Sequence, residues 1–175
     1  MPKALMRDAD GTSWLQRSVA VLVDGGCDAV TVVLGARAEE ARPLVPDGVT
    51  VVVAGDWEDG MSASLRAGLA ALGDDDAVVL SLVDLPDVSA EVISRVVAAG
   101  AGPAILSRAT YDGRPGHPVV IGREHWAGVA ESATGDHGAK PYLAAHRVTL
   151  VECGDLATGR DQDAPSPADP SETSR

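Results

Sequence analysis

The chain has 175 residues, of which 45% are hydrophobic and 3% are aromatic, and its formal net charge is −12. This length favours a single domain with a sizeable core, which Val, Ala and Leu must build because Phe is absent. The negative charge argues against nucleic acid or an anionic membrane as a partner, because both would repel the protein. Cys27 and Cys153 stand far apart without metal-binding spacing, which favours reduced thiols. No apolar run reaches membrane-spanning length, so we expect a soluble cytoplasmic protein.

The apolar residues alternate between two periods along the chain. A period near 3.6 predicts helices, and short β-branched runs predict strands that are buried on both faces. The expected helices cover residues 13–26, 37–45, 62–72, 89–100, 123–131 and 138–146. The expected strands cover residues 29–35, 49–55, 76–84, 103–108, 117–122 and 147–153, with the loop ATYDGRPG at 109–116. This alternation predicts an α/β fold with a Rossmann-like, mostly parallel sheet and helices on both faces.

The domain is expected to span residues 1–163. From Ala164 the sequence APSPADPSETSR has no apolar content to bury. Segments of this composition do not gain enough from burial to offset the entropy of ordering. We therefore expect residues 164–175 to form a disordered tail.

The first stretch that suggests chemistry is SLVDLPDV at 81–88. Asp84 follows a predicted buried strand, so it should lie at the carboxyl edge of the sheet, where open α/β sheets bind ligands. A carboxylate held there suits Mg²⁺, which prefers oxygen ligands and keeps waters and substrate phosphates. The alternative is a turn aspartate that only caps the next helix. Asp87 suits that capping role better than Asp84.

Two glycine-containing stretches could hold polar ligand atoms through their backbone. In GDWEDGMSASLRAG at 55–68, Gly60 precedes a predicted helix that Ser62 and Ser64 open, where free N–H groups and hydroxyls can hold polar ligand atoms. An ordinary N-cap is the favoured alternative there. In GDHGAK at 135–140, the glycines allow close backbone approach to a ligand, whereas Asp136 is more commonly an N-cap.

Two further stretches contain titratable side chains in turns. In YDGRPGHPVVI at 111–121, glycines and prolines shape a turn that delivers His117 to a strand, although a plain hairpin connection is the simpler interpretation. In GRDQDAP at 159–165, Asp161 or Asp163 could supply a second carboxylate, although acidic residues in such a place are usually only solvated.

Taken in order, these stretches resemble the molybdenum cofactor cytidylyltransferase group of the MobA-like nucleotidyltransferases. The motifs that carry the resemblance are MPKALM (1–6), WEDGMSASL (57–65), LVDLP (82–86), YDGRPGHPV (111–119), GDHGAK (135–140) and DQDAP (161–165). The combination of the second motif with the fourth is the specific part, and the resemblance covers nearly the whole chain. Lys140 stands where the family usually has Arg, and Ala164 stands where it usually has Thr.

The chain also departs from the family at its start. The family's opening strand and its Gly-rich loop, of the form LAAGxSxRMG, do not precede Pro2-Lys3. In a sheet of order 3-2-1-4 that first strand is central, so we expect its two neighbours to lose their shared partner. We expect a start placed too far downstream, with a genuine remnant that lacks activity as the alternative.

The resemblance implies Mg²⁺-dependent transfer of a nucleoside monophosphate, CMP from CTP as the best guess, to molybdopterin. It implies that Lys3 contacts the nucleotide phosphates, and that Asp84 and Asp163 hold Mg²⁺, with Asp161 left open as the alternative to Asp163. Gly60, Met61 and Ser64 are then expected to contact base and ribose, and the acceptor side is lined by Gly116, His117, Asp136 and Gly138.

The partners that the resemblance implies are CTP or another nucleoside triphosphate, molybdopterin, and a molybdoenzyme or its chaperone. Nucleic acid and membranes are not among them. Three alternatives stay open: a different phosphorylated acceptor, an oxidoreductase role such as similar chains have been given, and a non-catalytic homologue. Neither the oligomeric state nor the choice among nucleotides follows from the sequence.

Overall fold

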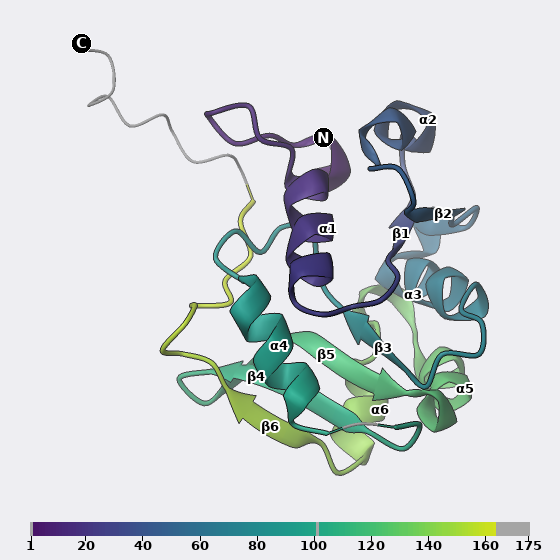
Figure 1. Ribbon diagram of the computed structural model, residues 1–175. Coiled ribbons are helices and arrows are strands. Elements are labelled where there is room, and N and C mark those ends of the chain that lie inside the picture. Colours follow the sequence, from purple (N-terminus) through teal and green to yellow (C-terminus); the bar gives the residue numbers. More distant parts are fainter. Residues whose placement is uncertain (1, 101, 164–175) are drawn as a thin grey trace.

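The computed structural model describes residues 2–100 and 102–163, which form an α/β fold (Figure 1). The expected tail at 164–175 lies outside the described residues, and a single domain over 1–163 stays a prediction. Within the described part, every helix is too short or too polar to cross a membrane.

The α-helices and strands appear where the periods of the sequence predict them, mostly with shorter bounds. The helices are α1 (Trp14–Asp24), α2 (Ala38–Ala41), α3 (Met61–Ala70), α4 (Ala90–Ala98), α5 (Arg123–Ser132) and α6 (Lys140–Ala145). The strands are β1 (Thr31–Leu34), β2 (Thr50–Val53), β3 (Ala77–Leu80), β4 (Leu106–Tyr111), β5 (Arg114–Gly122) and β6 (Thr149–Glu152). Short 3₁₀ turns are η1 (Lys3–Leu5), η2 (Arg42–Leu44), η3 (Trp57–Asp59) and η4 (Gly135–His137).

The loop expected at 109–116 is wrong, because β4 and β5 continue through it as a hairpin. The two strands pair antiparallel up to Tyr111 and Arg114. Asp112 and Gly113 make the turn, with φ of 51° and 76°. Positive φ at both central positions is what a two-residue type I′ turn requires, and Asp-Gly meets this requirement. β5 is therefore antiparallel to both of its neighbours, whereas β4 and β6 pair in parallel.

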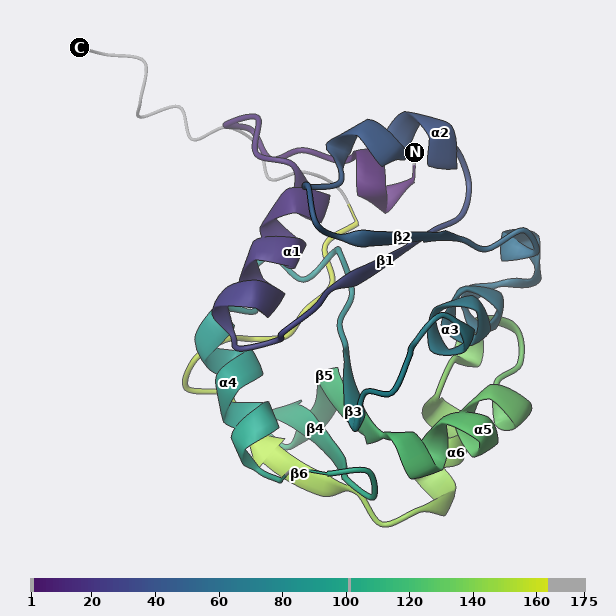
Figure 2. The same ribbon diagram turned by 45° about the vertical axis from the view of Figure 1, so that its right-hand side comes forward.

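The strands form two separate sheets. β1 pairs with β2 in parallel, and the remaining strands have the order β3-β5-β4-β6. Within the described residues, β1 and β3 each keep one edge without a strand partner. Figure 2 shows the β1–β2 pair above the larger sheet. The two sheets share no strand within the described residues, and the expectation that two strands have lost a common partner stays a prediction.

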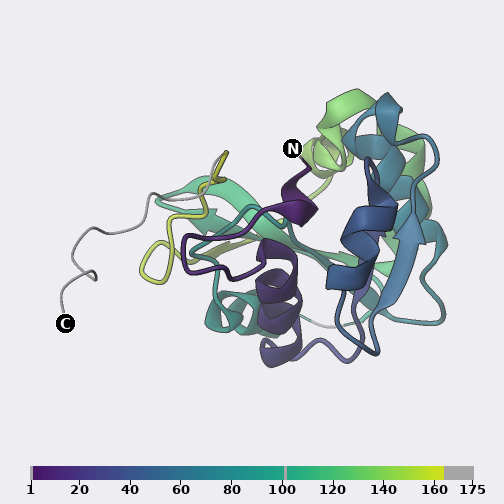
Figure 3. The ribbon, with the colours of Figure 1, turned by 90° about the horizontal axis from the view of Figure 1, so that it is seen from above.

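Three clusters of buried apolar side chains hold the elements together. Along β5, Val120 belongs to the cluster around α4, whereas Val119 and Ile121 belong to the cluster around α5 and α6. This alternation places the helices on opposite faces of the larger sheet, because successive strand side chains point to opposite sides. The third cluster packs Leu15 and Val19 of α1 on β1. Figure 3 shows α1 and α4 side by side.

Candidate active site

The candidate site forms where the first residues of the chain meet its last described ones. Lys3 lies in η1, and its Nζ is 3.5 Å from Oδ2 of Asp84 and 3.2 Å from Oδ1 of Asp163. Nζ also donates a hydrogen bond of 2.6 Å to the carbonyl of Gln162. The backbone N–H of Gln162 in turn donates to the carbonyl of Asp84 at 2.8 Å. Three distant parts of the chain are thus brought to one point.

The two carboxylates around Lys3 differ in their exposure to solvent. The side chain of Asp84 is 20% exposed, whereas that of Asp163 is 99% exposed. Burial opposes the charge on Lys3, but the hydrogen bond to Asp163 and the charges of Asp84 and Asp163 outweigh it, so the pKa of Lys3 is raised. Lys3 is therefore a cation at neutral pH, as the sequence interpretation requires.

Asp84 lies in the turn between β3 and α4, because β3 ends earlier than expected, at Leu80. The expectation that Asp87 caps the next helix is wrong. Its Oδ2 instead accepts hydrogen bonds of 2.6 Å from both the backbone N–H and the hydroxyl of Thr158. Asp87 thereby ties the returning C-terminal segment to the turn that carries Asp84. This contact helps to bring Gln162 and Asp163 to the site.

The donor set around Lys3 fits a hard divalent cation. Asp84 and Asp163 both lie within 4 Å of Lys3 Nζ, and Mg²⁺ is commonly bound by one or two carboxylates with waters and substrate phosphates completing the shell. Within residues 2–100 and 102–163, groups of three or more His, Cys, Asp or Glu that could hold a metal by themselves are absent. A bound metal would thus depend on the substrate. The charge of Asp161 acts instead on His117, whose protonated form it favours.

A second part of the site forms at the start of α3. Gly60 has φ of 95°, and a Cβ there would lie 2.6 Å from Oδ1 of Asp136. Only glycine tolerates both this backbone conformation and this approach. The N–H of Met61 donates to Asp136 Oδ1 at 3.2 Å, and the N–H of Gly138 donates to Ser62 Oγ at 3.2 Å. The loop carrying Asp136 and Gly138 therefore closes over the residues expected to contact the nucleotide, and Asp136 bonds the first N–H of α3.

His117 lies in β5, and Tyr111 fixes its backbone through a hydrogen bond. The Tyr111 hydroxyl donates to the carbonyl of His117 at 2.6 Å. The ring of Tyr111 fills the space that a Cβ at Gly116 or Gly159 would need, at 2.8 and 2.1 Å. Gly116 thus has a packing role next to its proposed one. Burial lowers the pKa of His117 to about 4, and the cationic Arg108 acts in the same direction, so the imidazole is neutral near pH 7.

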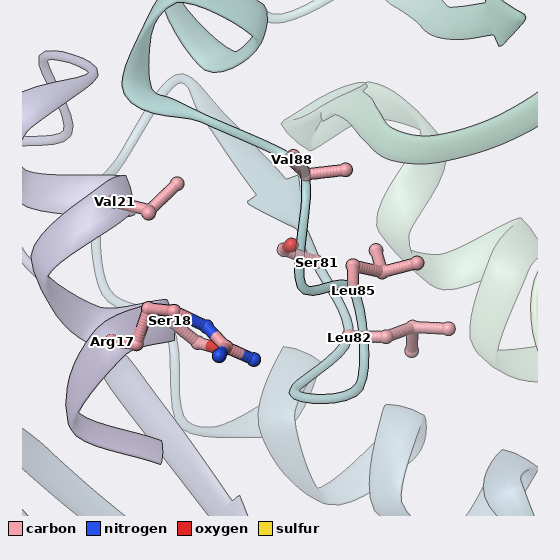
Figure 4. A pocket seen from close by; sticks show the side chains of 7 residues that line it. All are labelled: Arg17, Ser18, Val21, Ser81, Leu82, Leu85 and Val88. Atoms are coloured by element: carbon pink, nitrogen blue, oxygen red, sulfur yellow. The ribbon is translucent and has the colours of Figure 1, made fainter. Parts of the chain in front are cut away.

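A small cavity lies between α1 and the turn after β3 (Figure 4). Arg17, Ser18 and Val21 line it from α1, and Ser81, Leu82, Leu85 and Val88 line it from the other side. Its volume of about 10 Å³ admits one water molecule at most and excludes a nucleotide.

Two residues that build the site were not predicted from the sequence. Tyr111 positions His117, and Gln162 links Lys3 to Asp84. The signals were present, since Tyr111 opens the motif YDGRPGHPV and Gln162 stands between two aspartates in DQD. Their roles depend on packing and on a backbone carbonyl, which a sequence pattern does not express.

Comparison with known proteins places the chain among nucleotide-using enzymes. The family described as MobA-like NTP transferase domain matches residues 1–150. Nicotine blue oxidoreductase of Paenarthrobacter nicotinovorans is 34% identical over 173 residues, which cover 93% of this chain and 83% of that protein.

Solved structures agree with this family match. Rv0371c of Mycobacterium tuberculosis H37Rv, in complex with manganese, has a TM-score of 0.74 at 28% identity and covers 87% of this chain and 82% of its own. A homologue of it from Mycobacterium sp. strain JC1 has a TM-score of 0.77 at 26% identity, with coverage of 94% and 83%. The 2-C-methyl-D-erythritol 4-phosphate cytidylyltransferase of Thermus thermophilus shares the fold, with a TM-score of 0.62 at 21% identity and coverage of 93% and 89%.

Proposed function

Because the chain belongs to the MobA-like NTP transferase family and is a nucleotidyltransferase, we propose that it transfers CMP from CTP to molybdopterin with the help of Mg²⁺. The observation that carries this proposal is the convergence of Lys3, Asp84 and Asp163. One cation and two carboxylates at a sheet edge are suited to the phosphates and the metal of a nucleoside triphosphate. The resemblance to molybdenum cofactor cytidylyltransferases supports the choice of nucleotide and acceptor.

The proposed reaction is an in-line displacement at the α-phosphorus. A phosphate oxygen of the acceptor forms the new P–O bond while the bond to pyrophosphate breaks. Lys3 offsets the negative charge that develops on the leaving group, a contribution that is large in a preorganised site. Asp84 and Asp163 would hold Mg²⁺, which when bound neutralises phosphate charge. Asp84 is the better-sheltered ligand of the two, so its position is the better defined.

The remaining residues are proposed to hold the two substrates. Gly60, Met61 and Ser64 stand at the start of α3 for base and ribose, and the Met61 side chain is exposed there. His117 and Gly138 are proposed to line the acceptor side. Asp136 acts through Met61, because its carboxylate accepts the Met61 N–H and so fixes the first turn of α3.

The reaction is proposed to take place in the cytoplasm, where Cys27 and Cys153, both free thiols, stay reduced. The nucleotide-modified cofactor would then pass to a molybdoenzyme or its chaperone. A different phosphorylated acceptor would keep the same chemistry at Lys3 and Asp84.

An oxidoreductase is the second candidate function, favoured by the 34% identity to nicotine blue oxidoreductase. It predicts binding of a dinucleotide redox cofactor or a coloured protein. The nucleotidyl transfer proposal predicts a colourless protein that consumes a nucleoside triphosphate.

The deciding experiment measures pyrophosphate release with each of CTP, GTP, ATP and UTP, with and without molybdopterin, in Mg²⁺ or Mn²⁺. The chain and a version extended before Met1 by a family strand and Gly-rich loop are both assayed. Metal- and acceptor-dependent pyrophosphate release with formation of the nucleotidylated acceptor by either version supports the proposal. Oxidation of NADH or NADPH by a dye substrate, without pyrophosphate release, overturns it in favour of the second candidate.

A further inference from the structure

A second cleft lies on the face of the larger sheet that carries α6. Its volume is about 450 Å³, within the range of sites for small organic molecules. Its lining combines the basic side chains of Arg108, Lys140 and His146 with the apolar side chains of Leu143, Val148 and Leu150. Leu150 is 58% exposed there, which leaves apolar surface that a ligand could cover.

The charged side chains that line this cleft are basic, although the protein as a whole is acidic. The chain carries 26 acidic and 14 basic residues, yet acidic side chains are absent from the described lining. Arg108 donates from Nε and Nη2 to the carbonyl of Gly116, at 3.3 and 3.1 Å. Across the part of the chain that the structure describes, neither Arg108 nor Lys140 forms an ion pair with a carboxylate.

Because Arg108 is half-buried, its positive charge without a carboxylate partner is unfavourable. Its surroundings desolvate the guanidinium and lower its pKa, although Arg stays charged at neutral pH. A half-buried cation whose hydrogen bonds go to a neutral carbonyl gains from a bound anion. The planar guanidinium and the lysine ammonium together match a phosphate group better than either does alone.

The cleft lies next to His117, because Arg108 pairs across the hairpin with Val119 and donates to the carbonyl of Gly116, the residue before His117. Arg108 and Lys140 both act on His117 and disfavour its protonated form, and Asp161 favours it. The segment that begins at Asp161 continues to Gln162 and Asp163, which contact Lys3. A ligand held at Arg108 would therefore lie near His117.

We propose that this cleft is the acceptor subsite, in which Arg108 and Lys140 bind the phosphate of a phosphomonoester while Leu143, Val148 and Leu150 cover its apolar body. Its identification as the acceptor subsite rests on the proposed function, whereas the binding of a phosphomonoester does not. Arg108 is thereby a binding residue that the motifs of the sequence do not indicate. The neutral His117 adds no charge of its own to the phosphate site.

The test measures the binding of 4-methylumbelliferyl phosphate by fluorescence, with 4-methylumbelliferone and inorganic phosphate as probes that each lack one half of the ligand. The phosphomonoester is expected to bind at least about tenfold more tightly than either half, because it uses both the cations and the apolar wall. Equal binding of 4-methylumbelliferone overturns the anion site, and equal binding of inorganic phosphate overturns the apolar wall.

Three variants locate the site. Arg108→Gln and Lys140→Gln should each weaken phosphomonoester binding about tenfold, since each removes one charge-assisted contact. Arg147→Gln, which alters an exposed cation outside the cleft, should bind as the unchanged protein does. Lys140 is exposed, so its variant tests the site even if Arg108→Gln unfolds, and unaltered binding by Lys140→Gln overturns the proposal.

Nucleotide chemistry separates this inference from the proposed function. Phosphomonoester binding without any pyrophosphate release contradicts the proposed function and leaves the subsite intact. Nucleotidyl transfer whose KM for the acceptor is unchanged in Lys140→Gln contradicts the subsite and leaves the proposed function intact. The expected result is a raised KM for the acceptor and an unchanged KM for the nucleoside triphosphate.

Discussion

The Nζ atom of Lys3 and the Oδ1 atom of Asp163 lie 3.2 Å apart although 160 positions separate them in the chain. This contact brings the two ends of the described chain together over Asp84. It depends on the returning segment, which Asp87 holds through Thr158. The chemistry proposed for Lys3 thus depends on the path of the whole chain.

Replacement of Asp84 tests the proposed metal ligand. Asp84→Ala should lower metal-dependent transfer at least about 100-fold, in line with the loss of a group that stabilises charge in the transition state. The melting temperature should change little, because Asp84 lies in a turn. Steady-state kinetics and thermal unfolding measure the two effects. The control Asp75→Asn alters an exposed carboxylate in another loop. Full activity of Asp84→Ala would leave Asp84 as a turn residue.

Replacement of Gly60 tests the closure of the 135–138 loop over α3. Gly60→Ala should destabilise the fold by about 1–3 kcal/mol and raise the KM for the nucleotide, because it adds strain at positive φ and a contact with Asp136. Gly48→Ala is the matched control, since its φ of 80° is similar but its Cβ would meet nothing within 4 Å. Urea unfolding compares the two. Equal losses in both variants would show that the contact with Asp136 contributes nothing.

Protonation of His117 should destabilise the protein in mild acid. Its pKa is lowered to about 4 in the folded state from a usual 6.5, so the unfolded chain binds the proton more readily between these values. Stability is therefore expected to fall as the pH drops from about 6.5 to about 4, by up to about 3 kcal/mol. Titration of the imidazole by NMR measures the pKa, and His117→Gln should lose this part of the pH dependence. A folded-state pKa near 6.5 would contradict the prediction.

The ionised side chain of Glu152 should stabilise the β4–β5 turn at neutral pH. Its pKa is lowered to about 2 by the Thr110 hydroxyl and by the backbone N–H groups of Gly154, Gly113 and Asp112. Because the folded pKa lies below the usual 4.5, this stabilisation is complete above pH 4.5 and is lost as the pH falls towards 2.

Glu152→Gln should therefore lower the melting temperature at pH 7. The difference in melting temperature between this variant and the unchanged protein should become smaller at low pH. Glu131→Gln, at an exposed position on α5, serves as the control and should have little effect at either pH. A melting temperature of Glu152→Gln equal to that of the unchanged protein at pH 7 would show that the four hydrogen bonds are not stabilising.

The unpaired edges of β1 and β3 predict the effect of an added strand. The protein is expected to associate in solution, because strand edges without a partner promote association. An extension with a strand and a Gly-rich loop should yield a single species and raise nucleotide turnover. An extension of the same length in Gly and Ser should not. Gel filtration, thermal unfolding and turnover measure the three versions, and equal behaviour of all three would refute the prediction.

The sequence by itself determined the helices, the strands and the family motifs. The apolar residues of α1 and β1 repeat at the periods of a helix and of a buried strand, so neighbouring residues alone are enough to specify these elements. The motifs likewise placed Lys3, Asp84 and His117 among the candidates. Even the error at 109–116 was local, since Asp112-Gly113 is a hairpin signal within the sequence.

Only the tertiary structure decided which candidates meet. Asp161 and Asp163 are indistinguishable in DQDAP, yet Asp163 contacts Lys3 and Asp161 acts on His117. The cleft at Arg108 and Lys140 likewise joins a strand to a helix that follows much later. Such contacts depend on how the chain returns across the sheet, and that path is set by packing and by bonds between residues distant in sequence, such as Asp87 with Thr158. Local periodicity contains no information about them.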